Sequence, residues 1–201
     1  MPAPLTSLPP EENAELTLSV ERAFREAAVL ERLEAIWAVI LAKCFLLQWA
    51  IEAFQIPIRG LVYVWLLTFA MATMASALYL RANRMSLRIV PWQSRVSSAL
   101  LAGLLLGLGS LAYAHGARGW LPAGAAAGLA CGLLGNWALV RGVLSGASEQ
   151  YVGAVAWWVF GWQAAQDQDG RALLWVGLGF LGAQALPGFA RLARRRREQR
   201  V

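Results

Sequence analysis

The chain has 201 residues, of which 58% are hydrophobic and only 15% are charged, and its formal net charge is +6. This balance excludes an ordinary soluble globular domain, because such a domain seldom carries so much apolar surface, and it predicts an integral membrane protein. Much of the basic excess falls within residues 191–201, which contain six arginines. Such clustering favours contact with anionic lipid headgroups over contact with nucleic acid.

The first two predicted segments precede the membrane. Residues 1–16 are rich in proline and acid and predict a tail without fixed structure. In residues 17–34 apolar side chains recur every three or four positions, and Glu21 and Arg25 stand one helical turn apart with opposite charges. This segment predicts an amphipathic helix on the cytoplasmic side that leads into the membrane.

Six apolar segments follow and make residues 35–190 a predicted transmembrane domain. The segments are residues 35–56, 60–80, 96–114, 121–140, 151–166 and 172–190. Five of them have about the twenty residues that a hydrocarbon core of roughly 30 Å requires of a helix. The predicted fold is an all-α bundle of six transmembrane helices preceded by an amphipathic helix, provided that the shorter fifth segment also crosses.

The distribution of arginine predicts the orientation of these segments. Fourteen of the seventeen arginines precede segment one, lie between segments two and three or four and five, or follow segment six. Basic residues accumulate in cytoplasmic loops, and this pattern holds only if the fifth segment crosses. We therefore expect six spans in the inner membrane of a bacterium, with both termini cytoplasmic. The arginines expected to contact lipid headgroups in the C-terminal tail, residues 191–201, are Arg194, Arg195, Arg196 and Arg197.

Small residues at four-residue spacing predict where helices pack, because in lipid the close approach of two helices depends on small side chains. The two sets are Ala99, Gly103 and Gly107 in segment three, and Gly124, Gly128 and Gly132 in segment four. Since four residues turn about 400°, each set forms a nearly straight groove, and we expect segments three and four to pack through these grooves. In segment six, Pro187 removes a hydrogen bond and predicts a kink near the cytoplasmic end.

Polar side chains within the spans are candidate functional groups, because a charge in lipid is costly. Lys43 lies about 12 Å from the cytoplasmic start of segment one, so we expect it to face the bundle interior, pair with a polar group or touch water. The candidate polar track for a proton, ion or small solute comprises Lys43, Gln48, Glu52, Gln55, Asn136 and Gln184. The alternative is that Glu52 is interfacial and that Lys43 is satisfied by a backbone carbonyl, another subunit or a lipid phosphate.

Catalytic signals are weak, and no catalytic residue, metal site or cofactor is predicted. The residues from Gly146 to Glu149 resemble the nucleophile box of rhomboid proteases, but glutamate replaces the second glycine. The single histidine, His115, is expected at the opposite side of the membrane from Ser148. Residues 167–171 resemble a fragment of the CDP-alcohol phosphotransferase signature without its remaining carboxylates. Cys44 and Cys131 stand alone in apolar runs and lack the spacing of a redox or zinc motif.

Three classes of function remain open at this stage. The first is a non-catalytic membrane subunit or scaffold, whose partners would be membrane lipids, other membrane proteins or copies of itself. The second is a small-solute transporter or channel component, because the layout resembles the substrate-binding subunits of energy-coupling-factor vitamin transporters. An intramembrane enzyme is the third. We favour the first class, because packing residues are abundant and reactive residues are sparse.

Overall fold

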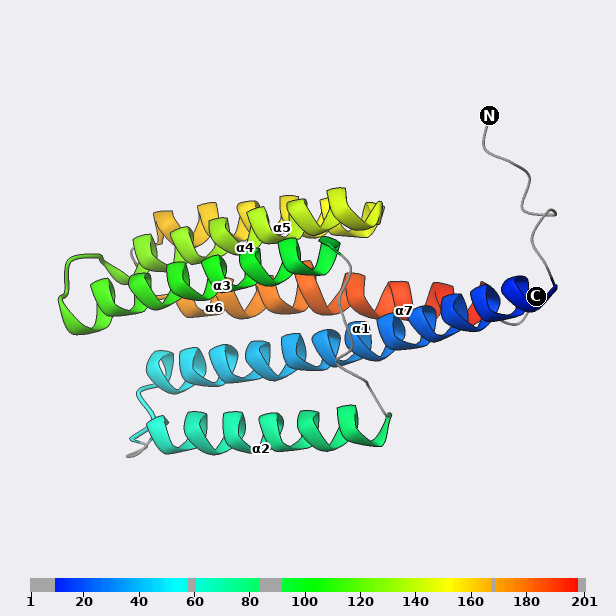
Figure 1. Cartoon of the computed structure of the whole chain (residues 1–201). Helices are drawn as coiled ribbons and strands as arrows, with labels where there is room; N and C mark the ends of the chain where they lie inside the picture. The colour runs from blue at the N-terminus through cyan, green and yellow to red at the C-terminus, as the bar shows by residue number, and fades with distance from the viewer. Residues whose placement is uncertain (1–9, 58–60, 84–91, 168, 199–201) are drawn as a thin grey trace.

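A computed structural model describes residues 10–57, 61–83, 92–167 and 169–198, with side chains described from residues 28 to 194 except at 58–60, 84–98 and 168. All regular elements in these ranges are helical (Figure 1). They are α1 (Pro10–Ala53), α2 (Leu61–Ala82), α3 (Trp92–Ala112), η2 (Tyr113–Ala117), α4 (Ala123–Ser145), α5 (Ser148–Gln166), α6 (Ala172–Gly179), η3 (Phe180–Ala185) and α7 (Leu186–Glu198), of which η2 and η3 are π-helical turns. The expected all-helical fold is confirmed.

Five helical stretches in the described residues are long and apolar enough to cross a membrane. They are Ala28–Ala53, Leu61–Ala82, Ala99–Ala117, Ala123–Ser145 and Ala172–Arg194. The last of these runs through α6, η3 and α7, because η3 joins the two helices without a break. The protein is therefore a helical membrane protein.

Helix α1 is one continuous helix of 44 residues. Neither glycine nor proline occurs between Pro10 and Pro57, so nothing in the sequence interrupts it. The expected amphipathic helix and the first apolar segment therefore form one helix. Residues 10–16 of the expected tail belong to α1; Pro10 followed by two glutamates is a favourable helix start. Residues 1–9 lie outside the described residues.

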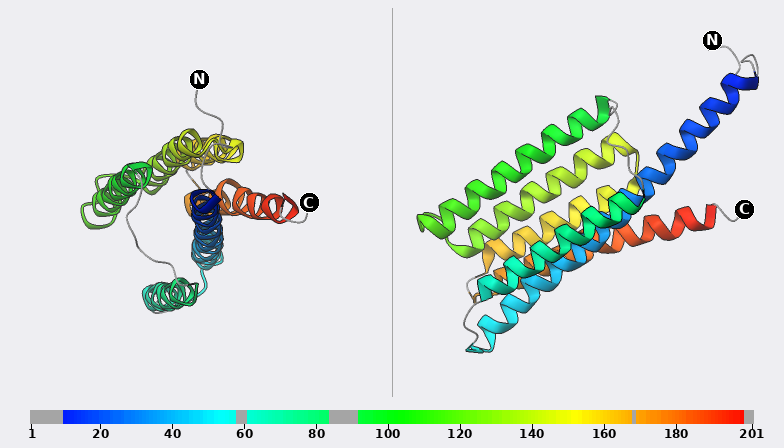
Figure 2. Two further views of the ribbon diagram at one scale, coloured as in Figure 1. Left: turned by 45° about the vertical axis from the view of Figure 1, so that its right-hand side comes forward. Right: turned by 60° about the horizontal axis from the view of Figure 1, so that its bottom comes forward.

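The helices do not lie in chain order (Figures 1 and 2). Helix α5 packs between α4 and α6, and α6 with η3 packs against α1. Helix α3 lies against α4, and α2 lies against α1, so that the order in space is α3, α4, α5, α6, α1, α2. Two helices that are consecutive in the chain, α2 and α3, thus lie at opposite ends of the row. The N-terminal part of α1 and helix α7 both extend beyond α4 and α5 at one end of the bundle.

The core is centred on Trp157 of α5, which is fully buried. Its ring packs against Gly179 of α6, where an added Cβ would lie 2.5 Å from Cζ3, so only glycine leaves room for the indole. Trp157 also makes an edge-to-face contact with Phe180, whose ring stacks on Phe45 of α1 at 5.7 Å between centroids. Phe45 in turn contacts Trp65 of α2. Aromatic rings therefore connect α5 to α2 across the centre of the bundle.

The glycine grooves are arranged differently from the prediction. Helices α3 and α4 are neighbours as expected, but a Cβ on Gly128 would lie 2.7 Å from Ala165 Cβ, on α5. A Cβ on Gly124 would lie 2.7 Å from the Ala164 carbonyl oxygen, also on α5, whereas Gly132 and Gly103 have nothing within 4 Å. The groove on α4 therefore receives α5, because α5 presents small residues at the contact. Helix α3 approaches more loosely: Ala99 is exposed, and Gly107 faces the Leu133 side chain.

The interruption expected near Pro187 takes the form of the π-helical turn η3. Proline has no N–H for the carbonyl of Ala183, four residues earlier, and η3 includes that residue. The Ala183 carbonyl oxygen instead lies against Gly153 of α5, where an added Cβ would be 2.5 Å away. The distortion therefore brings η3 close to α5.

Candidate functional site

A cluster of charged and amide side chains takes residues from five helical elements at one end of the bundle. Its centre is Glu34 of α1, which forms an ion pair with Arg141 of α4. Gln184 of η3 donates from Nε2 to the same carboxylate oxygen, Oε1, at 2.8 Å. The side chains of Arg141 and Glu34 are only 26% and 24% exposed, so the ion pair is partly buried. One carboxylate oxygen thus holds α1, α4 and η3 together.

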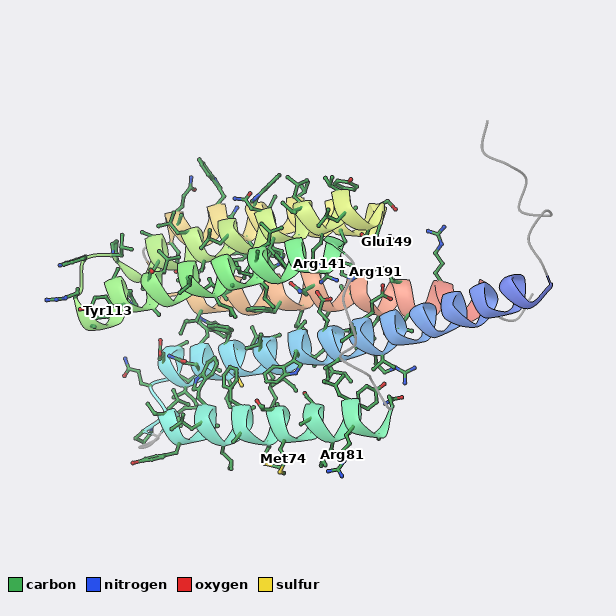
Figure 3. The ribbon with its side chains drawn as sticks, viewed as in Figure 1. Met74, Arg81, Tyr113, Arg141, Glu149 and Arg191 are labelled. Carbon is green, nitrogen blue, oxygen red and sulfur yellow. The ribbon has the colours of Figure 1, made fainter. Side chains whose placement is uncertain are left out.

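The same cluster continues between α5 and α7. Gln150 is buried, and in the amide orientation that satisfies both groups its oxygen accepts from Arg191 Nη1 at 2.6 Å and Nη2 at 2.9 Å. The neighbouring Glu149 lies 3.5 Å from Arg194 Nη1. Figure 3 shows Arg141, Arg191 and Glu149 at one end of the bundle and Tyr113 at the other.

The electrostatic environment favours an ionised Glu149. A hydrogen bond to its own backbone N–H lowers the pKa of the carboxyl, and the positive charge of Arg194 lowers it further, while partial burial acts in the opposite direction. The net direction is downward, so this carboxylate remains available to Arg194 at neutral pH. Because Arg194 is well exposed, the ion pair contributes little to stability.

Only part of the Arg-rich tail is described. Helix α7 extends to Glu198, and Arg194 points toward α5 while remaining exposed. The side chains of Arg195, Arg196 and Arg197 lie outside the described residues. Their contact with lipid headgroups stays a prediction.

The predicted polar track is not assembled as one path. Gln48 donates to Glu52 Oε1 at 2.8 Å and accepts from Trp65 Nε1 at 3.0 Å, near the other end of α1. Gln184 belongs instead to the cluster at Glu34, fourteen residues and hence about 21 Å from Gln48 along α1. Asn136 is exposed on α4, and Gln55 is exposed in the turn after α1 with φ of 50°.

Lys43 is exposed on the outer side of α1 and does not face the bundle interior. Its neighbours one turn away, Val39 and Leu47, are exposed as well. No hydrogen bond or ion pair joins the Lys43 ammonium to the side chains that the structure describes. Of the placements expected for Lys43, the structure shows an outward one, because the faces of α1 toward its helical neighbours are occupied by alanine and aromatic residues.

Ser148 and His115, weighed above as nucleophile and base, lie at opposite ends of the bundle. Ser148 Oγ lies 3.5 Å from Glu149 Oε2 at the end of the bundle that holds the cluster. His115 lies near Tyr113 at the far end, where its Nδ1 donates to the Leu121 carbonyl at 2.8 Å. Within the described ranges no group of three histidine, cysteine, aspartate or glutamate residues could hold a metal ion.

Four residues of the cluster were missed by the sequence reasoning: Glu34, Arg141, Gln150 and Arg191. Arg141 was counted as a loop charge, and Glu34 was assigned to a helix outside the membrane. One signal in the sequence would have placed Arg141 within helix α4 instead of a loop. Gly146, with φ of 66°, is the left-handed residue that ends α4, so the helix continues beyond Arg141. The pairing itself has no local signal, since Glu34 and Arg141 are 107 positions apart.

These features define a class: a helical membrane protein whose bundle is cross-linked at one end by partly buried ionic contacts. No protein-family model, curated protein or solved structure matches the chain.

Proposed function

We propose that the chain is a non-catalytic subunit that associates with other membrane proteins through its membrane-embedded faces. The polar cluster supports this assignment, because its carboxylate already has two donors within the protein. It acts as a cross-link that fixes α1, α4 and η3.

The observation that carries the proposal is the open edge formed by α2. None of its residues is buried, and its contacts are made on one side, toward α1. On that side Ser76 accepts from Trp37 Nε1 at 2.9 Å. Large apolar side chains elsewhere on α2 are exposed, and Figure 3 shows Met74 on the side away from α1. Since packing holds helices together in lipid, a second protein against this side would add the contacts that α2 lacks.

The proposed topology has six spans across an inner membrane, with both termini on its cytoplasmic side. Helix α5 contains the shorter fifth segment, and its packing supports a crossing. It runs antiparallel to α4, with Gln150 beside Gly142 at one end and Asp167 beside Gly124 at the other. Its 19 residues span about 28 Å, close to the thickness of a hydrocarbon core.

The proposal is tested by photo-crosslinking in native membranes. A photoreactive residue at Met74 is expected to give a discrete adduct with another polypeptide. The matched control is Ser76, which faces α1 and should give only internal links. Adducts with lipid alone at Met74, together with a monomeric mass of the chain extracted in its native lipid, would overturn the proposed function.

A solute-binding role is the second candidate, favoured by the position of Glu34 beside a π-helical turn, a distortion that is frequent at functional sites. Under this alternative, purified protein is stabilised against heat by a small solute, and Glu34→Gln removes the stabilisation. Glu52→Gln, at the other end of α1, is the control and should leave it unchanged. If no solute in a broad panel raises the unfolding temperature, this candidate is discarded.

A further inference from the structure

We propose that the outer face of α1 around Lys43 binds a transmembrane helix of a different protein, one that carries a carboxylate at the same depth in the membrane. This inference rests on the proposed function, because it specifies the chemistry of one partner. It concerns α1, a surface separate from the open side of α2.

The face has the pattern of a helix-packing seam. Ile36, Ile40, Lys43 and Leu47 follow one another at spacings of four, three and four residues, which is the repeat through which two helices interlock their side chains. Ile36, Lys43 and Leu47 are exposed, and Ile40 is half-buried. The remaining sides of α1 are occupied: Ala38 and Ala42 are buried in the core, and Phe45 contacts α2 and η3.

Lys43 lies deep within its span. The stretch of α1 from Ala35 to Ile51 carries no charge other than Lys43, which is eight residues from either end. Each separation corresponds to about 12 Å along the helix axis. A lysine side chain that close to the middle of a span reaches neither interface easily, and an ammonium group exposed to lipid is costly. A carboxylate supplied from outside would remove this cost by pairing with it.

The partner must be a different protein. In a two-fold dimer about an axis normal to the membrane, equivalent residues meet at the same depth, so Lys43 would face Lys43. The chain's own carboxylates are also unsuitable. Glu34 already binds Arg141, and Glu52 lies nine residues, about 14 Å, further along α1, where it accepts from Gln48. Charge complementarity therefore points to an acidic side chain on a foreign helix, and a single charge within an apolar seam fixes its register.

The test uses a defined probe. A synthetic transmembrane peptide of leucine and alanine with one central glutamate is reconstituted with the full chain in phosphatidylcholine vesicles, and association is measured by energy transfer between fluorophores. A second peptide has glutamine in place of the glutamate. We expect the glutamate peptide to associate about tenfold more tightly than the glutamine peptide, a preference that Lys43→Met removes and Lys43→Arg retains. Equal association of the two peptides with the wild-type chain would overturn the inference.

Two controls separate this face from general charge attraction and from lipid. The variant Lys43→Met/Met74→Lys moves the charge to the exposed side of α2; recovery of the preference there would show that the α1 seam is not required and would overturn the proposal. Phosphatidylglycerol is then added to the vesicles. If it abolishes the preference of the wild-type chain, Lys43 binds an anionic lipid instead. The outcomes distinguish the two proposals. A Lys43-dependent preference for the glutamate peptide with no adduct at Met74 refutes the proposed subunit role alone. An adduct at Met74 without a preference for the glutamate peptide refutes only this inference.

Discussion

The carboxylate of Glu34 receives both of its donors from helices that are distant in sequence. Arg141 forms an ion pair with it, and Gln184 donates to the same oxygen. For a partly buried pair, the loss of one partner costs more than the pair itself contributes, because the remaining charge stays desolvated without compensation. Glu34 and Arg141 are therefore expected to be coupled in their effect on stability.

We predict that Glu34→Gln lowers the free energy of unfolding in detergent by about 1–3 kcal/mol, toward the lower end because both side chains keep some exposure. The double variant Glu34→Gln/Arg141→Leu should recover most of this loss, since it removes the unpaired charge as well. Denaturant unfolding of both variants and of Arg141→Leu completes the cycle. The control Glu52→Gln should change the stability by no more than about 0.5 kcal/mol. If the loss of unfolding free energy in the double variant equals the sum of the losses in the two single variants, Glu34 and Arg141 are not coupled.

Sequence reasoning found which residues in the spans were unusual but not what they contact. Lys43 and Glu52 were recognised from their charge, and their placement on opposite faces of one helix follows from helical geometry. The outward direction of Lys43 could not be predicted, because it depends on which sides of α1 the other helices cover. The pair of Glu34 with Arg141 was missed for the same reason, since it forms only after α1 and α4 are placed in one bundle.

At the level of elements, the most extensive contact in the described bundle is between α4 and α5. Gly128 and Gly161 face each other there, and a Cβ on Gly128 would lie 3.0 Å from the Gly161 carbonyl oxygen. Gly132 lies one turn further along α4, and an added Cβ there would have nothing within 4 Å. The two positions share a helix and a residue type but differ in their surroundings.

We predict that Gly128→Ala lowers the free energy of unfolding by about 1–3 kcal/mol through overpacking. The matched variant Gly132→Ala should be neutral or up to about 1 kcal/mol more stable, because alanine has the higher helix propensity and meets no obstacle. Thermal unfolding of the two proteins in the same detergent gives the comparison. A Gly128→Ala protein as stable as Gly132→Ala would disprove the tight α4–α5 contact.

The elements themselves were largely predictable, because long apolar segments, Gly146 and Pro187 are local signals. Their pairing was not. The four-residue spacing of Gly124 and Gly128 predicts a groove, but a groove does not specify which helix occupies it. The small residues of α5, among them Ala164 and Ala165, determine that contact.

At the scale of the whole molecule, the order of the helices departs most from what the sequence indicates. Consecutive helices are usually neighbours, yet α2 and α3 lie at opposite ends of the row and the last apolar segment packs beside the first. Hydrophobic periodicity identifies helices but carries no information about their order, which follows from matched shapes such as Trp157 against Gly179. Because α2 and α3 lie at the ends of the row, each has a face that no described helix covers, and the open face of α2 underlies the proposed association with other membrane proteins.

The last prediction concerns the path of the chain through the membrane. The ion pairs that join α1, α4, α5 and α7 lie at one end of the bundle, the end that the arginine distribution assigns to the cytoplasm. Reporter fusions after Gly146 and after Arg194 should therefore both report the cytoplasm, whereas a fusion after Gly170, beyond the far end of α5, should report the opposite side. A fusion after Gly119, beyond η2, is the matched control for the far side and should agree with the one after Gly170. If the fusion after Gly170 instead reports the cytoplasm, α5 does not cross, and the proposed topology of six spans is wrong.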